Sequence, residues 1–246
     1  MRIYHTSDLH DHRGIAPRLR SLRQNAPGLL IDCGDSLRGS QTVYHRREPI
    51  IGEMDDAGYD AQAAGNREFH YLFNCMRARA AQMRHPLICS NLIDLKGREL
   101  PFRRFHTIEY AAAGERATRV HLAALLVTQY PAGSPWERIF GWRFLDPHEV
   151  VREFAETLPP DEPLIVLSHL GLRRDRELAA SNSRIDLLLG GHSHDTLFEP
   201  EVNGGVPIVH AGPYGRYASQ SDLHYDVTRG RWSLAASSLV PLLAAA

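Results

Sequence analysis

The side chains best suited to chemistry follow short apolar runs in this sequence. They are carboxylates, imidazoles and one amide, with no thiol among them: Asp8, His10, Asp35, Asn66, His169, His192 and His194. Imidazole nitrogens and carboxylate oxygens suit borderline or hard divalent cations, whereas structural zinc sites are usually rich in cysteine. These residue types therefore predict a site for Mn²⁺, Fe, Zn²⁺ or Ni²⁺.

The spacing of these residues indicates that they converge. Asp8 and His10 are two residues apart, so in extended backbone their side chains point the same way. His192 and His194 repeat this spacing after two glycines, which let the chain bend sharply. Seven ligands are too many for one ion and suit two ions that share a carboxylate. Two ions ~3.5–4 Å apart can hold a bridging hydroxide and orient its in-line attack on phosphorus.

The elements that must position these residues are short buried strands. Runs of apolar residues, each ending in a polar or glycine-rich turn, predict strands at 2–6, 28–32, 61–64, 86–89, 163–167 and 185–189. Helical spacing of apolar residues predicts helices at 15–24, 47–57, 69–82 and 146–158. Asp146 and Pro147 form a typical start for the last of these helices, with Glu149 at the capping-box position.

The alternation of strands and helices predicts an α/β fold. The segments 102–109, 119–127 and 206–240 resemble meanders of strands, with turns at Gly204-Gly205 and Arg229-Gly230. We therefore expect two packed mixed sheets with helices outside them. Ligands in such folds bind beyond the carboxyl ends of strands, and each candidate ligand follows a predicted strand.

The bulk composition excludes several classes of function. The 246 residues suit one large domain or two small ones, and the formal net charge of −1 gives no field that would attract a nucleic-acid polymer or an anionic membrane. Arginine clusters at 18, 20, 23 and at 173, 174, 176 lie in helix-like segments and are interpreted as solvated helix faces. No run approaches the ~20 apolar residues of a membrane span. The start MRIYHTSDLH has no apolar leader, and Cys33, Cys75 and Cys89 are odd in number, so we expect a cytoplasmic protein with free thiols.

In combination, five motifs make the sequence familiar. The sequence resembles the calcineurin-like metallophosphoesterase superfamily in these motifs, which are SDLH, LIDCGDSLRGS, AAGNREF, LSHLG and GGHSH. It resembles the 5′-nucleotidase and 2′,3′-cyclic-phosphodiesterase branch of that superfamily in the stretches MDDAGYDAQAAGNREF and VHAGPYGRY. The resemblance runs from about residue 2 to 228. It implies a four-layer α/β/β/α sandwich, a single catalytic domain over 1–246 without the C-terminal nucleotide-binding domain, and a small phosphoester substrate such as a nucleotide.

The resemblance also implies a distribution of the ligands between two metal ions. Asp8, His10, Asp35 and His194 would hold one ion, and Asp35 would bridge to a second ion held by Asn66, His169 and His192.

One residue departs from the family pattern. The family usually has G-N-H-[DE], with a His thought to protonate the leaving group, and this sequence has Arg67 in that position. A guanidinium cannot give up a proton near neutral pH, but it can stabilise negative charge on phosphoryl oxygens. If a helix begins near Arg67, His70 lies on the same face and could supply the proton. The alternative is that His70 only fills a gap, in which case esters with good leaving groups should be hydrolysed best.

Several further interpretations stay open. His12, Asn91, His210, Arg216 and Tyr217 could contact the substrate or orient a ligand, although a structural role is the simpler interpretation of each. The protein could also be a phosphodiesterase that prefers activated diesters or anhydrides. A non-catalytic metal-binding descendant of the family is the remaining alternative.

Overall fold

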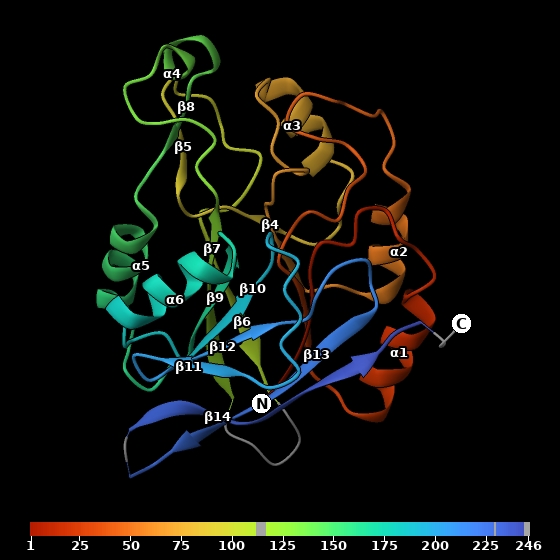
Figure 1. Cartoon of the computed structure of the whole chain (residues 1–246), viewed down its shortest axis with the longest axis vertical. Coiled ribbons are helices and arrows are strands. Elements are labelled where there is room, and N and C mark those ends of the chain that lie inside the picture. The colour runs from red at the N-terminus through yellow and green to blue at the C-terminus, as the bar shows by residue number, and fades with distance from the viewer. Residues whose placement is uncertain (112–116, 229, 244–246) are drawn as a thin grey trace.

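The computed structural model describes residues 1–111, 117–228 and 230–243. Two six-stranded sheets form its centre (Figure 1). The first has the order β14 (Arg231–Pro241), β13 (Tyr217–Asp226), β1 (Arg2–Thr6), β2 (Leu29–Asp32), β3 (Ala61–Ala63), β4 (Leu87–Ile88). The second has the order β11 (Glu201–Asn203), β12 (Val206–His210), β10 (Leu187–Gly190), β9 (Leu164–His169), β7 (Thr118–Leu126), β6 (Phe105–Tyr110).

Both sheets are mixed. In the first, β1 to β4 pair in parallel and the β13–β14 hairpin adds to β1 in antiparallel fashion. In the second, β12, β10, β9 and β7 are parallel, and β11 and β6 are antiparallel edge strands. Parallel strands that are neighbours have their carboxyl ends at the same edge of a sheet. The candidate ligands lie at or just after these carboxyl ends.

Helices cover the outer faces of the two sheets (Figure 1). They are α1 (Ala16–Asn25), α2 (Pro49–Ala57), α3 (Phe73–Ala80), α4 (Pro135–Phe140), α5 (Pro147–Glu156) and α6 (Leu172–Ser181). Helices α1 and α2 pack on the first sheet, and α5 and α6 pack on the second. A two-stranded sheet of β5 (Leu92–Asp94) and β8 (Trp142–Phe144) lies with α3 and α4 at one end.

The burial pattern explains this layering. Ile3 and Ile31 of the first sheet share one buried cluster with Leu122 and Leu167 of the second, so the inner faces pack against each other. The neighbouring residues along each strand point to the opposite face and are buried under the helices. Strands buried on both faces appear in the sequence as continuous apolar runs. The predicted four-layer α/β/β/α sandwich is thereby confirmed.

The predicted helices agree with the structure except around residue 69. The segment 206–240 is not one meander, because β12 belongs to the second sheet whereas β13 and β14 belong to the first. Asp146 caps α5, since its side chain accepts from the backbone N–H groups of His148 and Glu149. The turn at Gly204-Gly205 joins β11 to β12. The other predicted turn includes Arg229, which lies outside the described residues. The helix predicted at 69–82 begins only at Phe73, because the preceding residues form a loop around the site.

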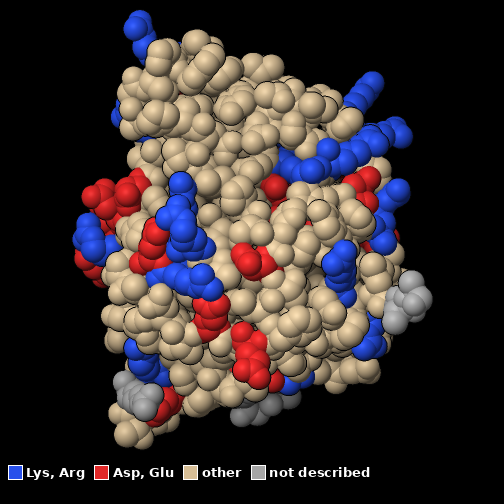
Figure 2. All heavy atoms as spheres, in the orientation of Figure 1, with Lys and Arg blue, Asp and Glu red and all other residues tan. Residues whose placement is uncertain are grey.

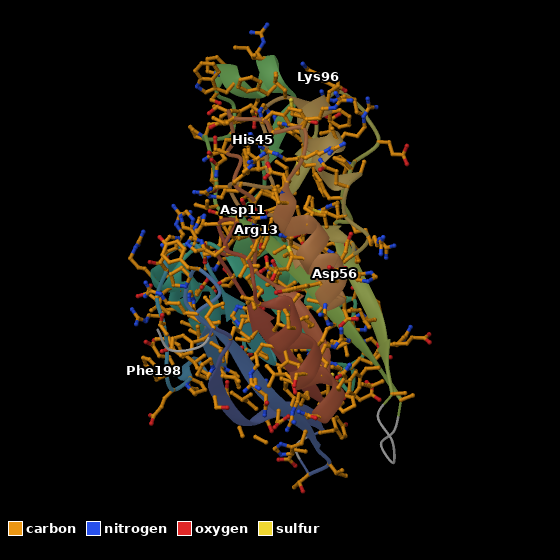
Figure 3. The ribbon with its side chains drawn as sticks, turned by 90° about the vertical axis from the view of Figure 1, so that its right-hand side faces the viewer. Asp11, Arg13, His45, Asp56, Lys96 and Phe198 are labelled. Carbon is orange, nitrogen blue, oxygen red and sulfur yellow. The ribbon has the colours of Figure 1, made fainter. Side chains whose placement is uncertain are left out.

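The surface matches the balanced composition. Basic and acidic side chains are interspersed over the face in Figure 2. The side view in Figure 3 places Asp11 and Arg13, from the loop that follows β1, near mid-height of the molecule. Across the described residues, no helix has the length and apolar character needed to span a bilayer.

Candidate metal centre

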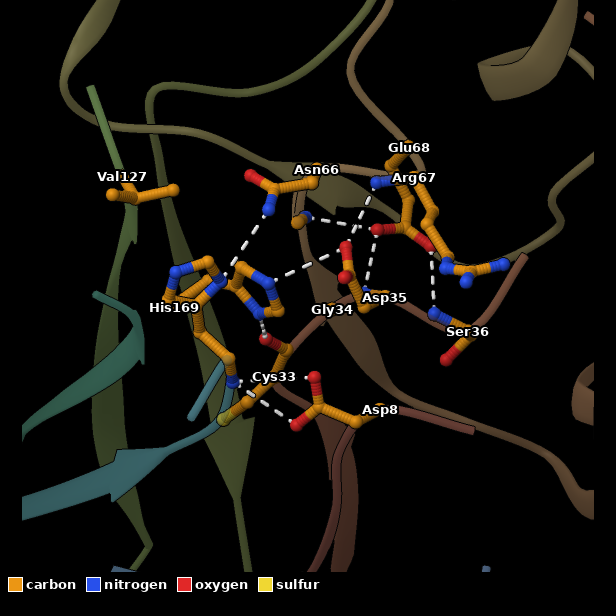
Figure 4. Close-up of polar contacts among 12 residues, drawn as sticks. Asp8, Cys33, Gly34, Asp35, Ser36, Asn66, Arg67, Glu68, Val127 and His169 are labelled. Atoms are coloured by element: carbon orange, nitrogen blue, oxygen red, sulfur yellow. Dashed lines mark hydrogen bonds and ion pairs between the residues drawn. The ribbon is translucent and has the colours of Figure 1, made fainter. Parts of the chain in front are cut away.

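The seven candidate ligands lie at the carboxyl ends of five strands that belong to both sheets. Figure 4 labels Asp8, Asp35, Asn66 and His169 among them. From the first sheet, Asp8 and His10 follow β1, Asp35 follows β2 and Asn66 follows β3. From the second sheet, His169 ends β9, and the other two histidines, His192 and His194, follow β10.

The backbone at these positions is unusual. Among the described non-glycine residues, positive φ angles occur at Asp8, His10, Asp11, Asp35, His192, His194 and Tyr214, with values between 49° and 75°. Five of these are candidate ligands. A left-handed conformation costs a non-glycine residue roughly 1–2 kcal/mol, and such strain tends to gather at functional sites. The loops therefore turn these side chains inward at an energetic cost.

One group of donor atoms comprises Asp8, His10 and His194. The Nε2 atoms of the two histidines are 2.9 Å apart. They lie 3.9 Å and 3.6 Å from Asp8 Oδ1, for His10 and His194 respectively. The Asp8 carboxylate is completely buried and also accepts the backbone N–H of His192, which fixes its orientation.

A second group comprises Asp8, Asp35 and His169. His169 Nδ1 lies 2.7 Å from the Cys33 carbonyl oxygen, so it carries the proton and leaves the Nε2 lone pair directed at the site. His169 Nε2 lies 3.3 Å from Asp35 Oδ1, yet it is buried and makes no hydrogen bond within the described structure. A buried nitrogen without a hydrogen-bond partner, held in this tautomer, is the arrangement that a metal ligand needs.

Asn66 and His192 are less well placed as ligands. Asn66 Nδ2 lies 3.4 Å from His192 Nδ1, whereas Asn66 Oδ1 accepts a hydrogen bond from Gln129 at 2.9 Å. The amide oxygen that a metal requires therefore points toward Gln129, and half a turn about the last side-chain bond would exchange it with the nitrogen. The His192 ring lies 5.0 Å from the His169 ring, outside both closely spaced groups.

Charges in the site are strongly coupled. Burial lowers the pKa of His10 to about 4, with Arg67 contributing, and burial and the charge of His169 lower the pKa of His192 to about 4. Both rings are thus neutral and able to donate a lone pair. Burial alone would lower the pKa of His169, but the charge of Asp35 raises it to about 10 in the metal-free protein, so a metal ion would replace a proton on Nε2. Burial raises the pKa of Asp8.

Glu68 is a site residue that the sequence reasoning missed. Its buried carboxylate accepts the backbone N–H groups of Asp35 and Gly65 at 2.8 Å, and that of Ser36 at 3.0 Å. It therefore ties the loop after β2 to the loop after β3. Burial raises the pKa of Glu68. The acidic residue at the end of the G-N-R-E motif was the available signal for this role.

Gly65 allows the two loops to approach so closely. A Cβ atom at this position would lie 2.4 Å from Asp35 N and 2.5 Å from Asp35 Oδ1. Any side chain would displace the central carboxylate.

The donor set fits divalent metal ions. It offers imidazoles, buried carboxylates and no thiolate, and the buried His169 Nε2, which has no hydrogen-bond partner in the described structure, faces the Asp35 carboxylate. The carboxylate common to the two donor groups is that of Asp8, whereas Asp35 as the bridging ligand stays a prediction.

Comparison with known proteins agrees with this geometry. The family model of the calcineurin-like phosphoesterases matches residues 1–196. The chain belongs to the calcineurin-like phosphoesterase family. It is 27% identical to the uncharacterized metallophosphoesterase YunD of Bacillus subtilis, over 92% of this chain and 50% of that protein. It is 24% identical to a 5′-nucleotidase of Vibrio cholerae, over 89% of this chain and 44% of that protein.

A solved structure shows the same fold. The 5′-nucleotidase precursor from Thermus thermophilus superposes with a TM-score of 0.77 at 23% identity, over 99% of this chain and 54% of that one. The chain thus spans about half the length of the curated relatives it matches. That residues 1–246 form one catalytic domain without a nucleotide-binding domain stays a prediction.

Arg67, which stands where the family usually has His, and the nearby His70 both bond to the backbone of loops. The Arg67 guanidinium donates to the carbonyl oxygens of Leu37 and Arg38 at 3.2 Å, and its charge still acts on His10. His70 is buried, and its Nδ1 accepts the backbone N–H of Leu72 at 2.9 Å. Because α3 starts at Phe73, the expectation that a helix begins near Arg67 is wrong, and these residues do not share a helical face. Proton donation by His70 stays a prediction.

Of the other candidates in this calcineurin-like phosphoesterase, two have clear structural partners. Asn91 bonds the backbone of Leu126 through both ends of its amide, as a structural role requires. His210 Nε2 lies 2.7 Å from Asp175 Oδ2 in a buried pair.

Two candidates, His12 and Arg216, lie around Tyr214, a residue that the sequence reasoning did not single out. The Tyr214 ring lies 5.5 Å from the His10 ring and 5.4 Å from the His194 ring. The guanidinium of Arg216 lies 5.7 Å from the Tyr214 ring, and the ring of His12 lies 4.7 Å from it. Tyr217 instead contacts the ring of Phe198.

Proposed function

We propose that this protein hydrolyses small phosphoesters with two divalent metal ions. One ion would be held by Asp8, His10, Asp35 and His194. The other ion would be held by Asp35, Asn66, His169 and His192. The observation that carries the proposal is the buried His169 Nε2, which has no hydrogen-bond partner in the described structure and lies 3.3 Å from Asp35 Oδ1.

When bound, the ions would supply a nucleophile derived from water at neutral pH and neutralise charge on the phosphoryl group. The residues of the chain have the remaining tasks. The Cys33 carbonyl oxygen holds His169 in the tautomer with a free Nε2. Glu68 accepts the backbone N–H of Asp35, and the backbone N–H of Arg67 donates to Asp35 Oδ1, so the backbone and the carboxylate of Asp35 are both fixed. The Arg67 guanidinium would stabilise negative charge on the transferring phosphoryl oxygens.

Nucleotides are the proposed substrate class, supported by relatives named 5′-nucleotidase. A second candidate class is activated esters, namely aryl esters, diesters and anhydrides. Arg67 cannot donate a proton, and the pKa of the buried His70 is lowered by burial and by Arg79. Leaving groups that depart without protonation would then be favoured.

The test is a substrate panel on protein loaded separately with Mn²⁺, Fe²⁺, Zn²⁺ and Ni²⁺. The panel contains an aryl phosphate, a bis(aryl) phosphate and a nucleoside 5′-monophosphate. We expect about two metal equivalents per chain and metal-dependent release of phosphate or aryl alcohol. A metal-loaded protein inert toward the whole panel would favour the non-catalytic descendant.

Variants connect the activity to the site. His194→Ala should lose one metal equivalent and about 100-fold or more in kcat/KM. His12→Ala, which removes a neighbouring loop histidine that lies outside both donor groups, is the matched control. A His194→Ala protein with full metal content and activity would exclude the proposed ligand set. His70→Ala should reduce alkyl and aryl ester rates equally, whereas a selective loss on alkyl esters would restore His70 as the proton donor.

A further inference from the structure

A cavity of about 260 Å³ opens beside His192. Val127, Leu170 and Leu172 give it an apolar wall, and Arg174, His192 and Ser193 give it a polar one. Figure 4 shows Val127 close to the Asn66 amide, so this cavity adjoins the candidate metal centre. Sites for whole small molecules usually measure ~300–1,000 Å³, so this space suits one part of a substrate.

Arg174 is the charged residue of this cavity that lacks a counterion. Its two arginine neighbours on α6 are paired: Arg173 with Glu177 at 2.9 Å, and Arg176 with Glu201 at 2.7 Å. No carboxylate among the described residues forms an ion pair with Arg174, and its side chain is only half-buried. A guanidinium facing a cavity without an anion is a candidate for binding one from solution.

The first turn of α6 is firmly attached to the site. Asp175, the residue after Arg174, is completely buried and hydrogen-bonded to Ser168 of β9 and to His210 of β12. The backbone N–H of Leu172 donates to Ser193 Oγ at 3.0 Å, which links the helix to the loop carrying His192. The backbone that carries Arg174 is therefore fixed before a ligand arrives, which reduces the entropic cost of binding.

We propose that Arg174 and this cavity form a subsite for a second phosphate of the substrate. Preferred substrates would then be phosphoesters that carry another phosphate, with the linking carbons against Val127, Leu170 and Leu172. The guanidinium offers the paired donors that match a phosphate, and a charge-assisted contact of this kind is among the stronger polar contacts in proteins. The inference deepens the proposed hydrolase function and rests on it.

The test uses the metal-loaded chain of residues 1–246 and non-hydrolysable ligands. Affinities for butylphosphonate and for ethane-1,2-, butane-1,4- and hexane-1,6-bisphosphonate are measured by titration calorimetry with metal in excess. The variants are Arg174→Gln and, as a matched control, Arg176→Gln, which removes the same charge from the same helix outside the cavity. Turnover of an aryl phosphate is measured separately.

We expect at least one bisphosphonate to bind about 10-fold or more tightly than butylphosphonate. Arg174→Gln should reduce that ratio to about 1–2, while Arg176→Gln should leave it within about twofold of the wild type. The subsite is refuted if no bisphosphonate is preferred, or if both variants change the ratio equally. Turnover of aryl phosphate without any bisphosphonate preference would leave the hydrolase proposal standing and remove only the subsite.

Discussion

Gly65→Ala is the sharpest test of how the site is built. The new methyl group would lie 2.4 Å from Asp35 N, 2.5 Å from Asp35 Oδ1 and 2.9 Å from His169 Cε1, whereas ordinary Cβ contacts begin near 3.4 Å. Two of these atoms belong to the Asp35 carboxylate and its backbone, which cannot rotate away as a flexible side chain would. Asp35 or the loop must therefore move by about 1 Å, and a functional site tolerates only ~0.5 Å.

Two measurements follow from this displacement. Overpacking should lower the free energy of unfolding of the metal-free protein by about 1–3 kcal/mol in urea denaturation. Metal affinity, measured by competition with a chelator, should fall about 10–100-fold because the displaced Asp35 carboxylate no longer faces His169.

Gly52→Ala is the matched control for Gly65→Ala. Gly52 lies on the exposed face of α2, and a Cβ there meets nothing within 4 Å, so alanine should stabilise the protein by about 0.5–1 kcal/mol. A Gly65→Ala protein with wild-type stability and metal affinity would refute the reasoning that the loops after β2 and β3 can approach each other only if residue 65 has no side chain.

Three further outcomes are expected. Glu68→Gln should lower the free energy of unfolding by about 1–3 kcal/mol, because backbone donors lose a charged acceptor, while the exposed control Glu156→Gln should change it by less than about 0.5 kcal/mol. Burial, and then the charge of His210, lower the pKa of His5 to about 3, so below pH 6.5 the unfolded chain takes up a proton that the folded protein excludes. The free energy of unfolding should therefore fall as the pH drops from 6.5 toward 3, by at most about 1.4 kcal/mol per pH unit from this group. Urea titrations at several pH values should show a shallower fall for His5→Gln but not for the control His224→Gln. Arg67→His should raise kcat/KM for an alkyl phosphate about tenfold or more relative to an aryl phosphate in steady-state assays, and equal changes on both esters would show that no proton donor had been missing.

Much of the architecture could be predicted from periodicity. The central strands are buried on both faces and flanked by turns, so their positions follow from apolar runs alone. The helix at 69–82 was placed too early because Phe69, Leu72 and Phe73 have helical spacing, yet residues 65–72 form the loop around Asp35. Hydrogen bonds between loops overrode local periodicity there.

The site could be predicted by residue type but not in its detail. Asp8, His10 and His194 meet as predicted, although their backbone is left-handed rather than extended. His192 lies outside both donor groups, which the D-x-H and H-x-H spacing does not indicate. The role of Glu68 depends on amides brought from another loop, and the direction of the Asn66 amide depends on Gln129, neither of which a sequence pattern shows. Likewise, the arginines of α6 were interpreted as one solvated face, although Glu177 and Glu201 pair with only two of them.

The candidate ligands come from both halves of the sandwich, four from the first sheet and three from the second. Bound ions would therefore strengthen a junction between two sheets that already adhere through apolar contact and through hydrogen bonds such as that between His169 Nδ1 and the Cys33 carbonyl oxygen. Any sliding of one sheet over the other would alter the coordination of the ions. Truncation of Leu122, which lies deep between the layers and far in sequence from the ligand-bearing loops, should thus appear as weakened metal retention as well as lost stability.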